Sequence, residues 1–186
     1  MVTTRPDGAR PARHKRGATD GFHISDAQID DILDTGILHV NGVGLMNRMD
    51  QGRTGEIMAE ARRRGVITTL DVFASTADDL PKVARLLPHT DYFLSSEDEA
   101  KALSGLAENP AQAQFLLDLG AGCVILTLGA NGAFYRHSDG TEFHTPAFLV
   151  KVKCTCGCGD CFEACPTKVD SGFVVRQAKN KKVEPV

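Results

Sequence analysis

The sequence predicts an α/β protein built on a doubly wound, mainly parallel sheet that ends in a β-hairpin. Three observations favour this fold class. Short apolar runs alternate with segments of helical periodicity, one run has the fully apolar character of a strand buried on both faces, and a turn signal separates two later runs. Strands that alternate with helices imply right-handed crossovers between parallel strands.

The composition limits the domain organisation and the location. The 186 residues are 42% hydrophobic and 24% charged, which is enough for one sizeable core. We expect a basic loop or tail at 1–22, an α/β domain at 23–165 and a polar tail at 166–186. The net charge of −3 argues against general nucleic-acid binding. Without an apolar leader or a membrane-length apolar run, we expect a cytoplasmic protein with no membrane partner.

The first half of the domain contains three short apolar runs and three helical segments. Ser25 and Gln28 form a capping-box pattern that opens a short helix, and Gly36 ends it. Apolar runs follow at 37–40, 66–72 and 92–94, with helical patterns at 54–64 and 78–87 between them. This order predicts two consecutive βαβ crossovers.

The second half repeats the alternation and then changes to a hairpin. Capping signals open helices at Ser96 and at Asn109, which glycines end at 105 and 120. A fully apolar strand is expected at 123–127. Strands at 133–137 and 142–145 flank the turn signal at 138–140, and one more short strand is expected at 148–152.

Three loops are the candidates for chemistry, because ligands bind beyond the carboxyl ends of strands in such sheets. Residues 127–132 include two glycines that allow close backbone approach, although a plain hairpin bend explains them equally well. Residues 95–99 carry three carboxylates, which suit either magnesium-bound water or the helix dipole. Residues 153–160 place two glycines before Asp160, a weak signal for an anion site and a proton acceptor.

Taken together and in order, these loops resemble the PfkB/ribokinase family of sugar kinases. That family shows an N-x-x-E motif, a T-L-G with a nearby glycine, and a D-T-x-G-A/C-G-D signature. The counterparts here are residues 96–99, 127–132 and 154–160, and Gly17-Ala18-Thr19 is similar to the substrate-side loop. The resemblance implies a ribokinase-type, Rossmann-like sheet that is incomplete relative to the family.

The resemblance also implies ATP-dependent phosphorylation of a small-molecule sugar or nucleoside hydroxyl, with ATP and Mg²⁺ as cofactors. Asp160 would be the general base. The N–H groups of Gly157, Cys158 and Gly159 would form the anion hole. The nucleotide would lie along Ser96, Thr127, Gly129 and Gly132, and Glu99 would act on magnesium through water.

Several departures from the family pattern lead us to expect a truncated domain of doubtful activity. Ser96 replaces the asparagine and Cys154 the leading aspartate of the motifs. Pro166 should end the helix after Asp160 within little more than one turn, because a proline inside a helix costs about 3 kcal/mol. A non-catalytic nucleotide-binding remnant is therefore an alternative. Substrate identity and the state of self-association, including a homo-oligomer, stay open.

The clustered cysteines support a second alternative. Five of the six cysteines fall between 154 and 165, and Cys158, Cys161 and Cys165 match the C-x-x-C-x-x-x-C-P part of a ferredoxin motif. With Cys156, they could hold a 4Fe-4S cluster in an electron-transfer segment, although the first cysteine is displaced by one position. Reduced thiols are the simpler explanation. The turn at 157–160 cannot serve both chemistries, and a junction of unrelated sequence would explain the overlap.

Overall fold

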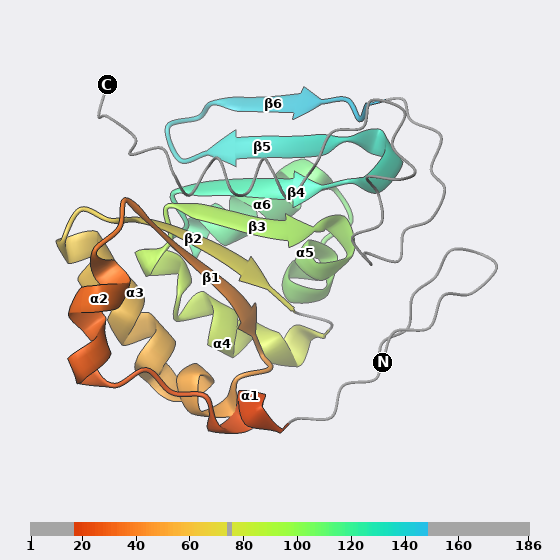
Figure 1. Ribbon diagram of the computed structural model, residues 1–186. Coiled ribbons are helices and arrows are strands. Elements are labelled where there is room, and N and C mark those ends of the chain that lie inside the picture. The colour runs from red at the N-terminus through yellow and green to blue at the C-terminus, as the bar shows by residue number, and fades with distance from the viewer. Residues whose placement is uncertain (1–16, 74–75, 149–186) are drawn as a thin grey trace, which may run out of the picture. The chain divides into compact units, whose positions relative to one another are not determined.

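A six-stranded sheet in the order β1-β2-β3-β4-β5-β6 organises the chain (Figure 1). The computed structural model describes residues 17–73 and 76–148. The strands are β1 (Ile37–Val43), β2 (Ile67–Val72), β3 (Tyr92–Ser96), β4 (Cys123–Thr127), β5 (Ala133–His137) and β6 (Glu142–Thr145). The pairs from β1 to β4 are parallel, and β5 and β6 add to β4 as antiparallel strands. The predicted α/β class, the mainly parallel sheet and the hairpin are confirmed.

Helices precede β1 and connect the parallel strands that follow it. They are α1 (Ala18–Gly21), α2 (Ile29–Leu33), α3 (Thr54–Arg63), α4 (Leu80–Ala84), α5 (Glu97–Ser104) and α6 (Asn109–Asp118), joined by the short turns η1 (Asp26–Gln28), η2 (Met49–Arg53), η3 (Ala77–Asp79), η4 (Leu87–His89) and η5 (Gly129–Asn131). α5 ends as predicted at Gly105, whose φ of 72° lies in the left-handed region. The last predicted strand, at 148–152, lies almost wholly outside the described residues.

Two predictions about local structure are wrong. The helix expected over 78–87 is broken into η3, α4 and η4, because Pro81 opens α4 and Pro88 lies within the following turn. The segment expected to be loop up to residue 22 contains the single helical turn α1. The boundaries of the three predicted parts of the chain stay a prediction.

The crossover helices pack on one face of the sheet. Leu70, Phe93 and Val124 from three neighbouring strands are fully buried in a single cluster with α3 to α6. Right-handed crossovers between consecutive neighbouring strands place their helices on the same side, which accounts for this layer. Residues on the other face, such as Ile37 and Ile67, are exposed. The helices that a doubly wound sheet requires on that face are not among the described residues.

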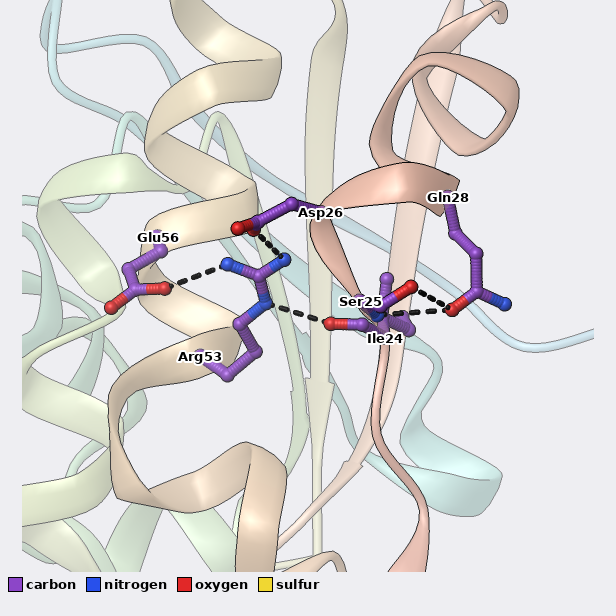
Figure 2. A network of polar contacts seen from close by, with 6 residues as sticks. All are labelled: Ile24, Ser25, Asp26, Gln28, Arg53 and Glu56. Atoms are coloured by element: carbon purple, nitrogen blue, oxygen red, sulfur yellow. Dashed lines mark hydrogen bonds and ion pairs between the residues drawn. The ribbon is translucent and has the colours of Figure 1, made fainter.

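The segment that precedes β1 is attached to α3 through Arg53 (Figure 2). The Arg53 guanidinium donates to the Ile24 carbonyl at 2.8 Å and forms ion pairs with Asp26 at 2.7 Å and Glu56 at 3.0 Å. Its side chain is only 17% exposed. In the same segment, the predicted capping box is confirmed, with the Gln28 side chain accepting from the Ser25 backbone N–H at 3.0 Å.

Candidate functional site

The carboxyl ends of β3 and β4 bring together two residues that are distant in the sequence. Ser96 ends β3, Thr127 ends β4, and the two are register partners across the parallel pair. The Thr127 hydroxyl donates to the Ser95 carbonyl at 3.4 Å. The row continues into the hairpin, where Thr127 pairs with Ala133 and Ala133 with Thr145. This row forms one side of the candidate site.

Ser96 and Glu99 are hydrogen-bonded to each other at the N-terminus of α5. The Glu99 Oε2 atom accepts from the Ser96 backbone N–H at 2.9 Å and from the Ser96 hydroxyl at 2.6 Å, while the Glu99 N–H donates to the Ser96 hydroxyl at 3.3 Å. This is a complete capping box, so the carboxylate has a structural role at the edge of the sheet. Among the described residues, its Oε1 atom accepts no hydrogen bond.

The loop after β4 is a tight turn closed by its own backbone. The Leu128 N–H donates to the Gly132 carbonyl at 2.8 Å, and the Gly132 N–H donates to the Gly129 carbonyl at 3.2 Å. Both glycines have positive φ, 57° at Gly129 and 91° at Gly132. The sequence signal that singled out both positions therefore has a conformational cause.

The two glycines differ in what surrounds them. A Cβ on Gly129 would have nothing within 4 Å, so this position leaves space at the edge of the sheet. A Cβ on Gly132 would overlap the Thr145 carbonyl oxygen and lie 2.7 Å from the Ala147 nitrogen. The backbone that follows β6 therefore requires a glycine at 132. This packing need accounts for Gly132 without a ligand.

One residue of this site was missed by sequence reasoning. The His144 ring lies on β6, and its Nε2 is 2.7 Å from the Asn131 carbonyl oxygen in the glycine loop. No motif marks the residue, and the contact spans 13 positions. The only available signal was its place in a hairpin strand next to that loop.

The predicted substrate-side residues lead into the segment that lies against β1, the edge strand opposite β6. Gly17 precedes α1, and Ala18 and Thr19 belong to it. This turn leads into Phe22, which lines a largely apolar hollow against β1 and α3. β1 is three strands away from β4 in the sheet. The structure therefore does not bring these residues to the Ser96 and Thr127 row.

The remaining predicted residues lie outside the described residues. They are Asp160 and the anion-hole residues Gly157, Cys158 and Gly159, together with the alternative cluster ligands Cys156, Cys158, Cys161 and Cys165. Within 17–73 and 76–148, no group of three or more metal-ligating side chains occurs. Cys123 is fully buried, as expected of a small apolar residue, and burial raises the pKa of its thiol.

The fold and the loops at this edge define a class of protein. It is an α/β protein whose candidate ligand site lies at the carboxyl ends of its parallel strands. The family model for pfkB family carbohydrate kinases matches residues 2–181. The chain therefore belongs to that family. The predicted resemblance to the PfkB/ribokinase family is confirmed.

Known relatives share sequence and fold with this chain. Aminoimidazole riboside kinase from Salmonella typhimurium is 32% identical over 168 residues, which cover 87% of this chain and 52% of the relative. Deoxyribokinase from Salmonella typhi is 36% identical over 80 residues, 40% of this chain and 26% of the relative. The chain thus spans about half or less of the curated relatives it matches.

Solved structures show the same fold. The aminoimidazole riboside kinase of Salmonella enterica is 32% identical with a TM-score of 0.57, over 68% of this chain and 45% of that chain. Ribokinase from Giardia lamblia aligns with a TM-score of 0.72 at 16% identity, over 87% of this chain and 52% of that chain, and supports the fold alone. Within the described ranges, no helix is long and apolar enough to cross a bilayer.

Proposed function

We propose that this chain supplies the nucleotide-binding part of a kinase that transfers a phosphoryl group from ATP to a hydroxyl of a sugar or nucleoside. The observation that carries the proposal is the juxtaposition of Ser96, Thr127 and the open Gly129 turn at the carboxyl edge, in a member of a carbohydrate kinase family. A cytoplasmic location and self-association stay predictions.

The side chains at the edge fit a magnesium nucleotide. The Thr127 hydroxyl lies where β4 ends, and the space around Gly129 would let a ligand approach the backbone closely. Mg²⁺ prefers oxygen ligands and keeps several waters, so the remaining Oε1 atom of Glu99 could act on it through water. Bound magnesium would neutralise charge that develops on the phosphates.

The transfer step is assigned to residues beyond the described part. The oxygen of the acceptor hydroxyl would bond to the γ-phosphorus while Asp160 accepts the proton of that hydroxyl. The bond between the γ-phosphorus and the bridging oxygen would break, and ADP would leave. The N–H groups of Gly157, Cys158 and Gly159 would bind the transferred group during this step. Asp160→Asn should therefore abolish transfer and leave ATP binding largely intact.

Similarity to named relatives supports the substrate class. One similar structure, the aminoimidazole riboside kinase of Salmonella enterica, holds aminoimidazole riboside and an ATP analogue. Other relatives are ribokinases of Schizosaccharomyces pombe and Mus musculus, 32% and 34% identical. A free sugar and a nucleoside are therefore the two acceptors to test first.

The test measures binding and transfer separately. Titration calorimetry with ATP and Mg²⁺ should show saturable binding, and a coupled assay for ADP should show turnover with ribose or aminoimidazole riboside. Binding without turnover would favour a nucleotide-binding protein that does not catalyse transfer. Absence of both would refute the proposal.

Glu99→Gln tests the magnesium role without removing the helix cap, because glutamine also completes a capping box. We expect unchanged thermal stability and about fivefold weaker ATP binding at limiting Mg²⁺, since a charge that acts through water contributes on the order of 1 kcal/mol. Glu108→Gln is the matched control, because Glu108 precedes α6 without a side-chain cap. Equal effects of the two substitutions would contradict the role of Glu99.

A further inference from the structure

The last strand of the hairpin has few side-chain anchors. All four residues of β6 are exposed, and backbone pairing with β5 holds the strand in the sheet. The Phe143 ring stacks on Tyr135 with centroids 4.5 Å apart and an interplanar angle of 16°. This stack fixes the middle of the strand and leaves its end near the glycine loop to other contacts.

Two contacts join the end of β6 to the glycine loop. The His144 Nε2 lies 2.7 Å from the Asn131 carbonyl oxygen, and Gly132 lies against the backbone at Thr145 and Ala147. A carbonyl oxygen can only accept, so the ring nitrogen donates. The turn is therefore held by a side chain at Asn131 and by close packing at Gly132.

We propose that His144 is a positioning residue for the nucleotide loop, an inference that rests on the proposed function. By holding the Asn131 carbonyl, His144 keeps the 128–132 turn in the orientation that presents the open side of Gly129. The residue acts through its contact with the loop. A preorganised loop binds its ligand more tightly because less ordering is required on binding.

The test compares two substitutions at one position. His144→Ala removes the donor, whereas His144→Gln places an amide N–H near the position of Nε2. We expect His144→Ala to raise the native-state hydrogen-exchange rates of the Asn131 and Gly132 amides about fivefold, which corresponds to one lost neutral hydrogen bond. The affinity for ATP with Mg²⁺ should fall by about the same factor. His144→Gln should restore both values to within about twofold of wild type.

His137→Ala is the control in the same hairpin. His137 lies at the opposite end of β5, where its ring contacts Asp139 at 3.2 Å. We expect this variant to leave the loop amides and ATP affinity unchanged. Unchanged loop exchange in His144→Ala would overturn the positioning role, and so would raised exchange with unchanged ATP affinity.

The design separates failure of this inference from failure of the proposed function. Hydrogen exchange is measured without nucleotide and tests whether His144 holds the loop. Absence of ATP binding by the wild-type chain would overturn the proposed function, and with it the nucleotide role of His144.

Discussion

Gly132→Ala offers the sharpest structural test of the candidate site. The added Cβ would overlap the Thr145 carbonyl and lie 2.7 Å from both the Ala147 nitrogen and the Pro146 carbonyl carbon. These are backbone atoms, so no side-chain rotation can relieve the clash. The φ of 91° at this position is also unfavourable for alanine.

The expected magnitude follows from these two effects. Backbone strain of this kind costs about 1–3 kcal/mol, and forcing extra volume into a packed region costs about 1–3 kcal/mol. We therefore expect the free energy of unfolding to fall by about 4 kcal/mol. With an m-value of about 2 kcal/mol/M, the urea midpoint should decrease by about 2 M.

Gly129→Ala is the matched control in the same turn. Its φ of 57° lies in the left-handed region, but an added Cβ would meet nothing within 4 Å. Only the conformational cost of about 1–2 kcal/mol applies. Urea unfolding followed by circular dichroism measures both variants. A Gly132→Ala variant that is no less stable than Gly129→Ala would rule out close packing as the reason for a glycine at 132.

Three further predictions concern groups outside the glycine loop. Hydrogen bonds from Arg63, the larger effect, and from Arg64 lower the pKa of Glu60 from 4.5 to about 2. The stability that the Glu60 carboxylate contributes is therefore present above pH 4.5 and is lost as the pH falls toward 2. Urea midpoints should show a weaker pH dependence in that window for Glu60→Gln, and identical curves would contradict the pairing. A hydrogen bond to Cys123 and burial raise the pKa of Tyr135 to about 12, so one of the two tyrosines should ionise only near that pH. The stability that Tyr135 contributes is present below pH 10 and is lost as the pH rises through 12. Cys123→Ala should lower the ultraviolet titration midpoint of Tyr135, and an unchanged midpoint would count against the hydrogen bond as the cause. Arg53→Lys should lower the urea midpoint, because lysine cannot reproduce the three contacts of the guanidinium group. The exposed Arg48→Lys is the control and should have little effect on the urea midpoint.

Local sequence signals predicted most of the elements. The capping boxes at Ser25 and Ser96 and the left-handed end at Gly105 depend on atoms within a few residues of one another. The strands at 123–127, 133–137 and 142–145 have the predicted bounds. The break at Pro81 and Pro88 was missed because the apolar spacing over 78–87 outweighed the proline signals in that prediction.

The sequence by itself determined the family, the order of helices and strands, and the loops that are candidates for ligand binding. Only the tertiary structure decided that Ser96 and Thr127 meet at one edge, that Gly132 is required by the chain after β6, and that His144 contacts the glycine loop. The physical reason is the separation along the sequence of the residues that interact. Caps, turns and periodicity arise from neighbours along the chain, whereas strand register and close packing join residues that the sequence separates by 13 to 31 positions.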